Sequence, residues 1–279
     1  MDWRGRRMST NVEDRRGRGG MVRTGGIGGL GLIVVLLIGV FFGVDVTPFL
    51  GGGSVSTEAP AGPNEIGDDN EAFVATVLAG TEDVWGPIFQ QSGLTYTEPR
   101  LVLYSGVTRS ACGGANAAMG PFYCPNDQTV YLDMDFFRVL DQQMGAGGEF
   151  AAAYVIAHEV GHHVQNELGT LGQVHQARSR MSERDSNALS VRTELQADCY
   201  AGMWARGAQD IFNVGRQDVA EAMNAAARIG DDALQKASRG VAVPDSFTHG
   251  SSEQRQTWFY RGYETGDPGQ CDTFKARAL

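Results

Sequence analysis

Residues 157–166, AHEVGHHVQN, hold three of the five histidines in this 279-residue chain, and their spacing constrains the fold. The surrounding apolar residues, with GAGG before them and Gly169 after them, predict a helix from Glu149 to Leu168. His158 and His162 are four residues apart, so both imidazoles project from one face of that helix. Two imidazoles in this arrangement suit Zn²⁺, which accepts nitrogen ligands in tetrahedral geometry. The fold must then bring a third ligand to this face.

Glu159 follows His158 directly, where its carboxylate reaches a water on the metal without ligating the ion. His-Glu-x-x-His on a helix is the pattern of a zinc hydrolase, with the glutamate as general base. The alternative is a pair of core histidines, which is costly because bare imidazoles on an apolar face lack partners. His163 lies 100° around the helix from His162, and we expect it to be solvated or to support the site without ligating.

The third ligand is expected on a second helix, predicted over residues 181–207. Glu194 and Asp198 are one turn apart there, within the mostly apolar ELQADCYAGMWA. As in a thermolysin-like site, Glu194 would ligate zinc and Asp198 would accept a hydrogen bond from a ligand histidine and fix its tautomer. The alternative is a solvated pair of surface charges. His175 is a weaker rival for the third position, and a Cys199 thiolate would indicate a deformylase-like hydrolase.

The chain has four cysteines, an even number that suits two disulfides in an oxidising compartment. Sequence alone permits three pairings. Cys112 and Cys124 bracket a Gly-rich loop and could close it locally, which would leave Cys199 to pair with Cys271. Free buried thiols are the alternative, and they are less expected outside the cytoplasm.

Residues 25–44, GGIGGLGLIVVLLIGVFFGV, form an uncharged apolar run. At about 1.5 Å per residue, a helix of this length spans a bilayer core of about 30 Å. Seven arginines lie in residues 1–24, and no Lys or Arg follows the run until Arg100. The positive-inside rule then predicts a single-pass protein of the cell membrane with a cytoplasmic N-terminus and an extracytoplasmic main domain. A cleaved signal peptide is the alternative, but no small-residue cleavage site follows closely.

Downstream of this run the composition predicts a flexible linker over residues 45–70 and one domain over residues 71–279. Within that domain the patterns predict a helix near residue 71, a buried strand at 100–106, a hairpin at 117–133, and then mostly helix. The fold class is therefore α+β. The net charge is −10, and all of the excess acid lies after residue 44, which argues against nucleic acid as a partner.

Several motifs together resemble the bacterial neutral zinc metallopeptidase family across nearly the whole chain. They are AHEVGHHVQN, SVRTELQADCYAGMWA, PFYCPNDQTVYLD and FTHGSSEQRQTWFYRGYETGD. The resemblance implies a zincin-like metallopeptidase domain with a small mixed sheet and several helices, zinc as the cofactor, and a protein or peptide as the substrate. His158, Glu159, His162 and Glu194 all match the family's metal-binding pattern.

A zinc peptidase also needs a donor for the oxyanion that develops on the scissile carbonyl. His249, in FTHGSSEQR, is the candidate, because thermolysin-like enzymes use a downstream histidine in this role. The alternative is a structural loop histidine, and Tyr260 and Arg255 are further possibilities. We expect the substrate to add as a strand along AAMGPFY, and QTVYLD to be interior. A different class of function stays open: an inactive extracytoplasmic module that binds zinc or a partner protein.

Overall fold

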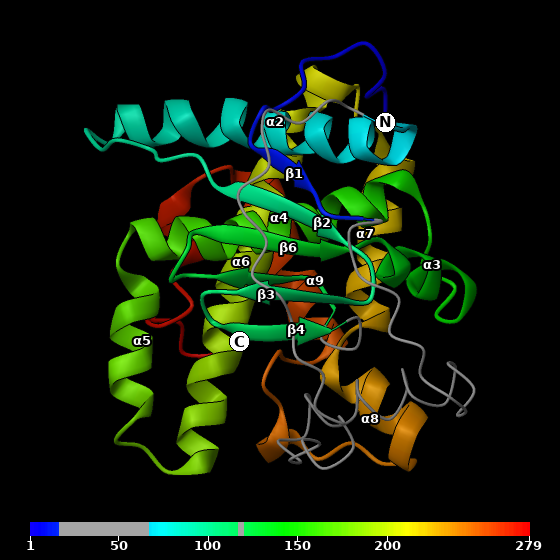
Figure 1. The fold of residues 1–279 in the computed structure, drawn as a ribbon. Coiled ribbons are helices and arrows are strands. Elements are labelled where there is room, and N and C mark those ends of the chain that lie inside the picture. Colours follow the sequence, from blue (N-terminus) through cyan, green and yellow to red (C-terminus); the bar gives the residue numbers. More distant parts are fainter. Residues whose placement is uncertain (17–66, 117–119) are drawn as a thin grey trace.

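The computed structural model describes residues 1–16, 67–116 and 120–279, and they form an α+β fold (Figure 1). A four-stranded sheet has the order β1-β2-β6-β5. Its strands are β1 (Val12–Asp14), β2 (Arg100–Tyr104), β5 (Phe122–Cys124) and β6 (Thr129–Asp133). Strands β1, β2 and β6 are parallel, and β5 runs antiparallel to β6. The predicted hairpin therefore exists, with β6 interior and β5 at one edge of the sheet.

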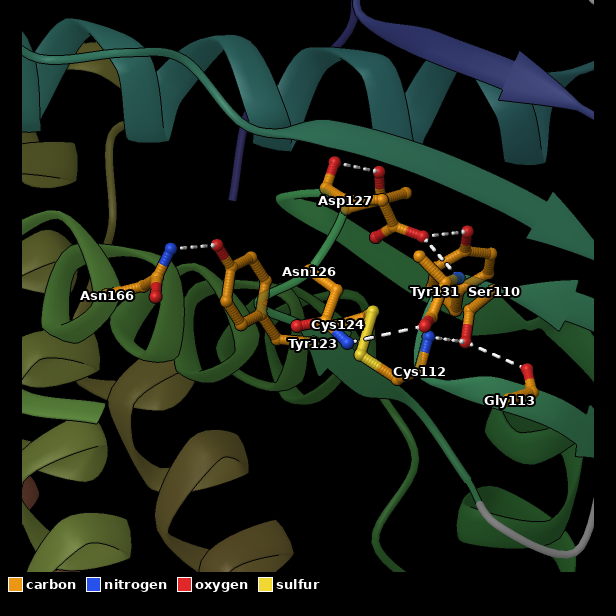
Figure 2. The surroundings of a disulfide bond; sticks show 11 residues. Ser110, Cys112, Gly113, Tyr123, Cys124, Asn126, Asp127, Tyr131 and Asn166 are labelled. Atoms are coloured by element: carbon orange, nitrogen blue, oxygen red, sulfur yellow. Dashed lines mark hydrogen bonds between the residues drawn. A yellow bond between two sulfur atoms is a disulfide. The ribbon is translucent and has the colours of Figure 1, made fainter. Parts of the chain in front are cut away.

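A short antiparallel hairpin follows β2 and makes a second sheet. It consists of β3 (Val107–Ser110) and β4 (Gly113–Asn116). The Cys112–Cys124 disulfide joins the turn of this hairpin to the end of β5, with the two Cα atoms 5.8 Å apart (Figure 2). Asp127 reinforces the junction, because its Oδ2 accepts from the Ala111 N–H and from the Tyr131 hydroxyl. The disulfide thus bonds edge strand β5 covalently to the β3–β4 hairpin.

Eight α-helices are described, and most of them lie where the hydrophobic periodicity predicts helix. They are α2 (Asp69–Gln91), α3 (Met134–Gln142), α4 (Glu149–Glu167), α5 (Thr170–Arg178), α6 (Glu183–Phe212), α7 (Arg216–Arg228), α8 (Asp231–Arg239) and α9 (Ser252–Thr265). Two 3₁₀ turns are Pro244–Ser246 and Pro268–Cys271. Side chains cap several helix starts: Asp68 accepts from the Glu71 N–H and Ser182 from the Asp185 N–H.

The helical core is built on α6, which packs against both α4 and α9 behind the sheet (Figure 1). Gly202 of α6 and Gly262 of α9 allow the closest approach. A Cβ at Gly202 would collide with the backbone of Phe259, and a Cβ at Gly262 would collide with the backbone of Cys199. The second disulfide, Cys199–Cys271, ties α6 to the C-terminal segment, with Cα atoms 5.6 Å apart. Both disulfide predictions are confirmed, and the described residues contain no free cysteine.

The first sixteen residues are part of this fold. Strand β1 pairs with β2, with Val12 opposite Leu101. Trp3 is buried and meets Phe73 of α2 edge to face, with ring centroids 5.5 Å apart. The Arg7 guanidinium lies 2.8 Å from the Glu82 carboxylate of α2. The sequence interpretation assigned all of these residues to a cytoplasmic arm and did not anticipate the strand.

The predicted localisation was wrong. We expected a single-pass membrane protein with residues 1–24 in the cytoplasm and the main domain on the other side. In the described ranges, no helix combines the length and the apolar character needed to cross a membrane. The predicted span, residues 25–44, lies outside the described residues, as does most of the predicted linker. Residues 1–16 also pack in the same fold as the domain, so the two cannot lie on opposite faces of a bilayer in this structure.

Candidate metal centre

Three side chains from two helices converge as a group that could hold a metal ion. They are His158 and His162 of α4 and Glu194 of α6, whose ligand atoms all lie within 4.8 Å of one another. Glu194 Oε2 is 3.2 Å from His158 Nε2 and 3.5 Å from His162 Nε2. Tetrahedral zinc with bonds of about 2.0–2.1 Å places neighbouring ligand atoms about 3.4 Å apart. The two carboxylate–imidazole distances therefore suit ligands of one tetrahedral ion, which would keep a further position.

The hydrogen bonds on the far side of each ring leave both Nε2 atoms facing the centre. His158 Nδ1 donates to Asp198 Oδ1 at 2.8 Å, and His162 Nδ1 donates to Gln165 Oε1 at 2.8 Å. The direction of the first bond follows because an ionised carboxylate can only accept. The direction of the second follows because the Gln165 amide nitrogen donates to the Thr193 carbonyl. In its neutral form each imidazole would thus present an Nε2 lone pair to a cation.

The charges at the centre call for a cation between these atoms. Burial opposes a positive charge on His158, but the carboxylates of Asp198 and Glu194 outweigh it and raise the pKa of His158 to about 10. Burial would raise the pKa of Glu194, but the imidazoles of His162 and His249 hold it well below its usual range. Without an ion a proton must therefore sit between imidazole and carboxylate, and a divalent cation can replace it.

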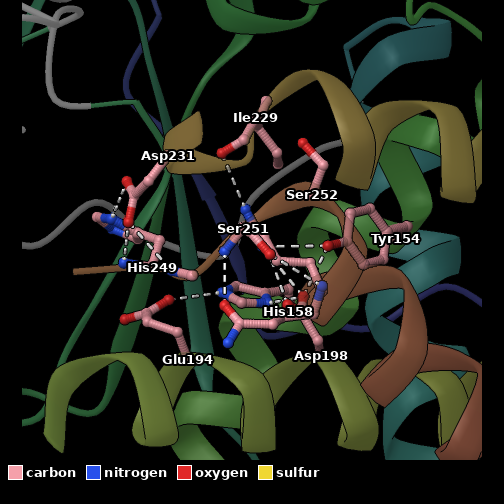
Figure 3. A network of polar contacts seen from close by, with 12 residues as sticks. Tyr154, His158, Glu194, Asp198, Ile229, Asp231, His249, Ser251 and Ser252 are labelled. Atoms are coloured by element: carbon pink, nitrogen blue, oxygen red, sulfur yellow. Dashed lines mark hydrogen bonds and ion pairs between the residues drawn. The ribbon is translucent and has the colours of Figure 1, made fainter. Parts of the chain in front are cut away.

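Asp198 lies behind His158 in a fully buried polar network (Figure 3). Its carboxylate accepts from the Tyr154 hydroxyl at 2.6 Å and from Arg255 Nε and Nη2 at 2.9 and 3.0 Å. Burial opposes ionisation, but Arg255 and His158 lower the pKa of Asp198 to about 2. The carboxylate is therefore ionised and paired, so it can both orient His158 and strengthen its basicity. Arg255 comes from α9, which the α6–α9 glycine contact brings into reach.

Glu159 and His249 both line the cavity above the three candidate ligands. Glu159 is buried, and that burial raises its pKa. The loop of His249 is held by Asp231, whose Oδ2 accepts from the N–H groups of Thr248, His249 and Gly250 at 2.7, 2.7 and 3.0 Å. Asp231 Oδ1 is 3.6 Å from His249 Nδ1. The structure thus places a buried carboxyl and a supported imidazole in the same cavity.

The cavity has a volume of about 720 Å³, and much of its wall is apolar. Leu171 and Val174 of α5 line one part and Leu234 of α8 another, and these helices lie on opposite sides of the molecule in Figure 1. Phe122 and Tyr123 of edge strand β5 also line it. The cavity is therefore a cleft that reaches from the candidate metal group to strand β5 at the edge of the sheet.

Comparison with known proteins agrees with this chemistry. Residues 1–274 match the model of the family described as "Putative neutral zinc metallopeptidase". The chain belongs to this family. It is 48% identical over 285 residues to the "Uncharacterized protein YpfJ" of Escherichia coli K12, covering 98% of this chain and 99% of that protein. It is 44% identical over 228 residues to the "Uncharacterized protein Rv2575" of Mycobacterium tuberculosis H37Rv, covering 76% and 75%. No solved structure matches the chain.

Family membership implies zinc as the metal and supports a hydrolase at a coarse level. The donors present fit zinc, which takes imidazole nitrogen and carboxylate oxygen in four-coordinate sites. The two rival third ligands lie elsewhere. His175 lines the cleft but is not part of the candidate metal group, and Cys199 is in a disulfide. Tyr260 is 41% exposed and does not line the cleft.

Of the two roles expected for His163, the structure excludes the solvated one. The residue is completely buried, with Nε2 donating to the Thr97 carbonyl at 2.6 Å and Nδ1 3.0 Å from the Tyr123 hydroxyl. Burial lowers the pKa of His163, which keeps the ring neutral. Its ring thus links helix α4 to edge strand β5. The interpretation also missed Tyr154, Asp231 and Gln165, although Gln165 follows His162 at helical i+3 spacing and so shares its face.

Proposed function

We propose that this chain is a zinc-dependent peptidase with a zincin-like domain, in which His158, His162 and Glu194 hold the ion. The observation that supports this most directly is the separation of 3.2 and 3.5 Å between Glu194 Oε2 and the two imidazole Nε2 atoms. Family membership supports the choice of zinc and of hydrolysis. When bound, Zn²⁺ would supply Lewis acidity that activates a water and polarises a carbonyl.

Glu159 would act as the general base. It follows His158 on α4, lines the cleft and lies outside the three-residue metal group. Burial raises the pKa of its carboxyl, which brings it closer to the neutral range where a base is effective. The carboxylate would accept the proton of the attacking water and return it to the leaving amine. His249, supported by Asp231, would donate a hydrogen bond to the developing oxyanion.

The cleft suggests how a polypeptide substrate would be held. Strand β5 has β6 on one side, and among the described residues no strand pairs with its other side. An extended peptide could pair with that side, as in other cases of strand addition. Phe122 and Tyr123 would then lie beside the substrate, and the apolar cleft wall would accept apolar side chains.

The decisive experiment compares the wild type with Glu159→Gln and His162→Ala, using His175→Ala as the matched histidine control. We expect wild type and His175→Ala each to bind one zinc ion, and wild type to cleave casein or a peptide library. Glu159→Gln should retain zinc and lose cleavage, because only the base is removed. His162→Ala should lose zinc. If wild type and Glu159→Gln both bind zinc and neither cleaves any substrate, the chain is a binding module and not a peptidase.

A further inference from the structure

A buried chain of hydrogen bonds leads away from the second candidate ligand. His162 Nδ1 donates to Gln165 Oε1 at 2.8 Å, and Gln165 Nε2 donates to Gln196 Oε1 at 3.1 Å. Gln196 Nε2 then donates to the Cys271 carbonyl at 3.0 Å. Cys271 is covalently bonded to Cys199. These three hydrogen bonds thus connect α4, α6 and the C-terminal segment.

The orientation of each amide in this chain is determined by its neighbours. The amide nitrogen of Gln165 has two hydrogens, and it donates one to the Thr193 carbonyl at 2.7 Å and one to Gln196. Turning Gln165 over would set its oxygen against the Thr193 oxygen and its NH₂ against the His162 N–H. Turning Gln196 over would set its oxygen against the Cys271 carbonyl. Only one arrangement satisfies every donor and acceptor, and it leaves His162 Nε2 free for a metal.

Because these hydrogen bonds are buried, the loss of any one of them is costly. Gln165 and Cys271 are fully buried, and Gln196 is 7% exposed. Water is therefore poorly placed to replace a lost partner, and an unsatisfied buried amide costs about 1–3 kcal/mol. If one hydrogen bond of this series is lost, the neighbouring amide can regain a partner most easily by reorienting. At Gln165, which bonds to His162, such a reorientation would turn the His162 ring.

The outer end of the chain is fixed by the C-terminal segment. The Thr273 hydroxyl donates to the Arg192 carbonyl at 2.6 Å, and the Arg192 guanidinium donates to the carbonyls of Thr273 and Ala276. The Cys199–Cys271 disulfide adds the covalent anchor beside these bonds. Together they set the position of the Cys271 carbonyl that Gln196 requires.

We propose that Gln165 and Gln196 are positioning residues for His162, and that the Cys199–Cys271 disulfide anchors them, so that zinc affinity depends on this bond. The inference rests on the metal site proposed above, but it does not require that the protein be a peptidase. Outer residues that orient a ligand histidine contribute about 10–100-fold to metal affinity. We expect an effect of that size from the glutamines.

The test measures the dissociation constant of zinc by competition with a chromophoric chelator. Gln196→Glu preserves the shape of the side chain but faces a carboxylate oxygen toward the Cys271 carbonyl, and it should weaken binding by about 10–100-fold. Cys199→Ala/Cys271→Ala should weaken it in the same direction. Cys112→Ala/Cys124→Ala is the matched control, because it removes the other disulfide and should leave the dissociation constant unchanged.

Two further measurements keep the proposal falsifiable. The visible spectrum of the cobalt-substituted protein should change in Gln196→Glu, since a turned imidazole alters the ligand field, whereas a general loss of stability would leave it unchanged. If removal of the Cys199–Cys271 bond prevents folding, Gln165→Leu takes its place. Equal dissociation constants and spectra in wild type and Gln196→Glu would overturn the inference. Absence of cleavage by zinc-loaded wild type would instead overturn only the peptidase proposal.

Discussion

Replacing Asp198 with asparagine should destabilise the protein and weaken zinc binding for two separable reasons. The substitution keeps the shape of the side chain but removes its charge. Oδ1 accepts from His158 and Tyr154, while Oδ2 accepts from Arg255 Nε at 2.9 Å. If the amide oxygen of the variant faces the first pair, its NH₂ group faces the guanidinium, and two donors oppose each other.

The magnitude follows from the burial of the ion pair. The side chains of Asp198 and Arg255 are 0% and 4% exposed, so the guanidinium of the variant would stay buried without a counter-charge. Removing one partner of such a pair costs about 3–5 kcal/mol in the free energy of unfolding. Zinc affinity should fall by about 10–100-fold, because a neutral amide supports the His158 imidazole less strongly than a carboxylate.

The assay is chemical denaturation of the metal-free protein together with a zinc titration. It is applied to Asp198→Asn, to Arg255→Met and to the double variant Asp198→Asn/Arg255→Met. The double variant removes the buried cation as well, so it should recover most of the lost stability. Zinc affinity should remain low in the double variant, because the carboxylate behind His158 is still absent. A loss below about 1 kcal/mol in Asp198→Asn would refute the reasoning about the buried pair. Recovery of zinc affinity in the double variant would refute the orienting role of Asp198.

Three further predictions concern packing, pH and the metal. Gly202→Ala should cost about 3 kcal/mol because its Cβ meets the Phe259 backbone, whereas Gly172→Ala, in open space on α5, should gain up to about 1 kcal/mol in urea denaturation. Burial and Asp272 raise the pKa of Tyr200 to about 12. About 2–3 kcal/mol of stability, fully present below pH 10, should therefore be lost as the pH rises from 10 to 12. Tyr200→Phe should flatten that decline. Zinc at 100 times its dissociation constant should add about 2.7 kcal/mol to wild type, a chelator should remove this gain, and His162→Ala should not show it.

The helices that carry the metal group could be predicted because their periodicity is strong and local. The predicted helix from Glu149 to Leu168 is observed as Glu149–Glu167, and the region around Glu194 lies in Glu183–Phe212. Edge strand β5 could also be assigned, because the adjoining strand β6 leads directly into a helix. In each case the signal lies within about twenty residues of sequence.

Two of the missed elements, β1 and α5, have little local signal. Strand β1 is three residues long, and its partner Leu101 lies far along the chain from Val12. Helix α5 buries no residue completely, so its pattern shows no clear apolar face. The role of Arg255 depends on helix α9 meeting α6, a tertiary contact that sequence spacing does not encode. The N-terminal arginines led to the wrong prediction of a cytoplasmic N-terminus. In the structure Arg7 and Arg16 pair with acidic residues of the fold and of the turn before α2.

The two carboxylates of the Glu-x-x-x-Asp pair differ because of what surrounds them. Glu194 keeps 15% of its side chain exposed at the cleft, whereas Asp198, one turn further into the core, is 0% exposed and neutralised by Arg255. The partly exposed position of Glu194 suits a ligand that must meet an incoming ion. The buried position of Asp198, where a guanidinium neutralises the charge, suits a group that only orients another ligand. The same spacing on one helix thus provides two different environments, which suit the two roles proposed for these residues.

Each imidazole of the metal group is oriented by the C-terminal part of the chain. Arg255 of α9 holds the carboxylate behind His158, and the Cys271 carbonyl holds the amides behind His162. The three candidate ligands span only residues 158–194, yet both of these relays end on residues beyond 250. A site with the same three ligands but without the final two helical segments would retain the donors and lose the geometry that makes them suitable for zinc.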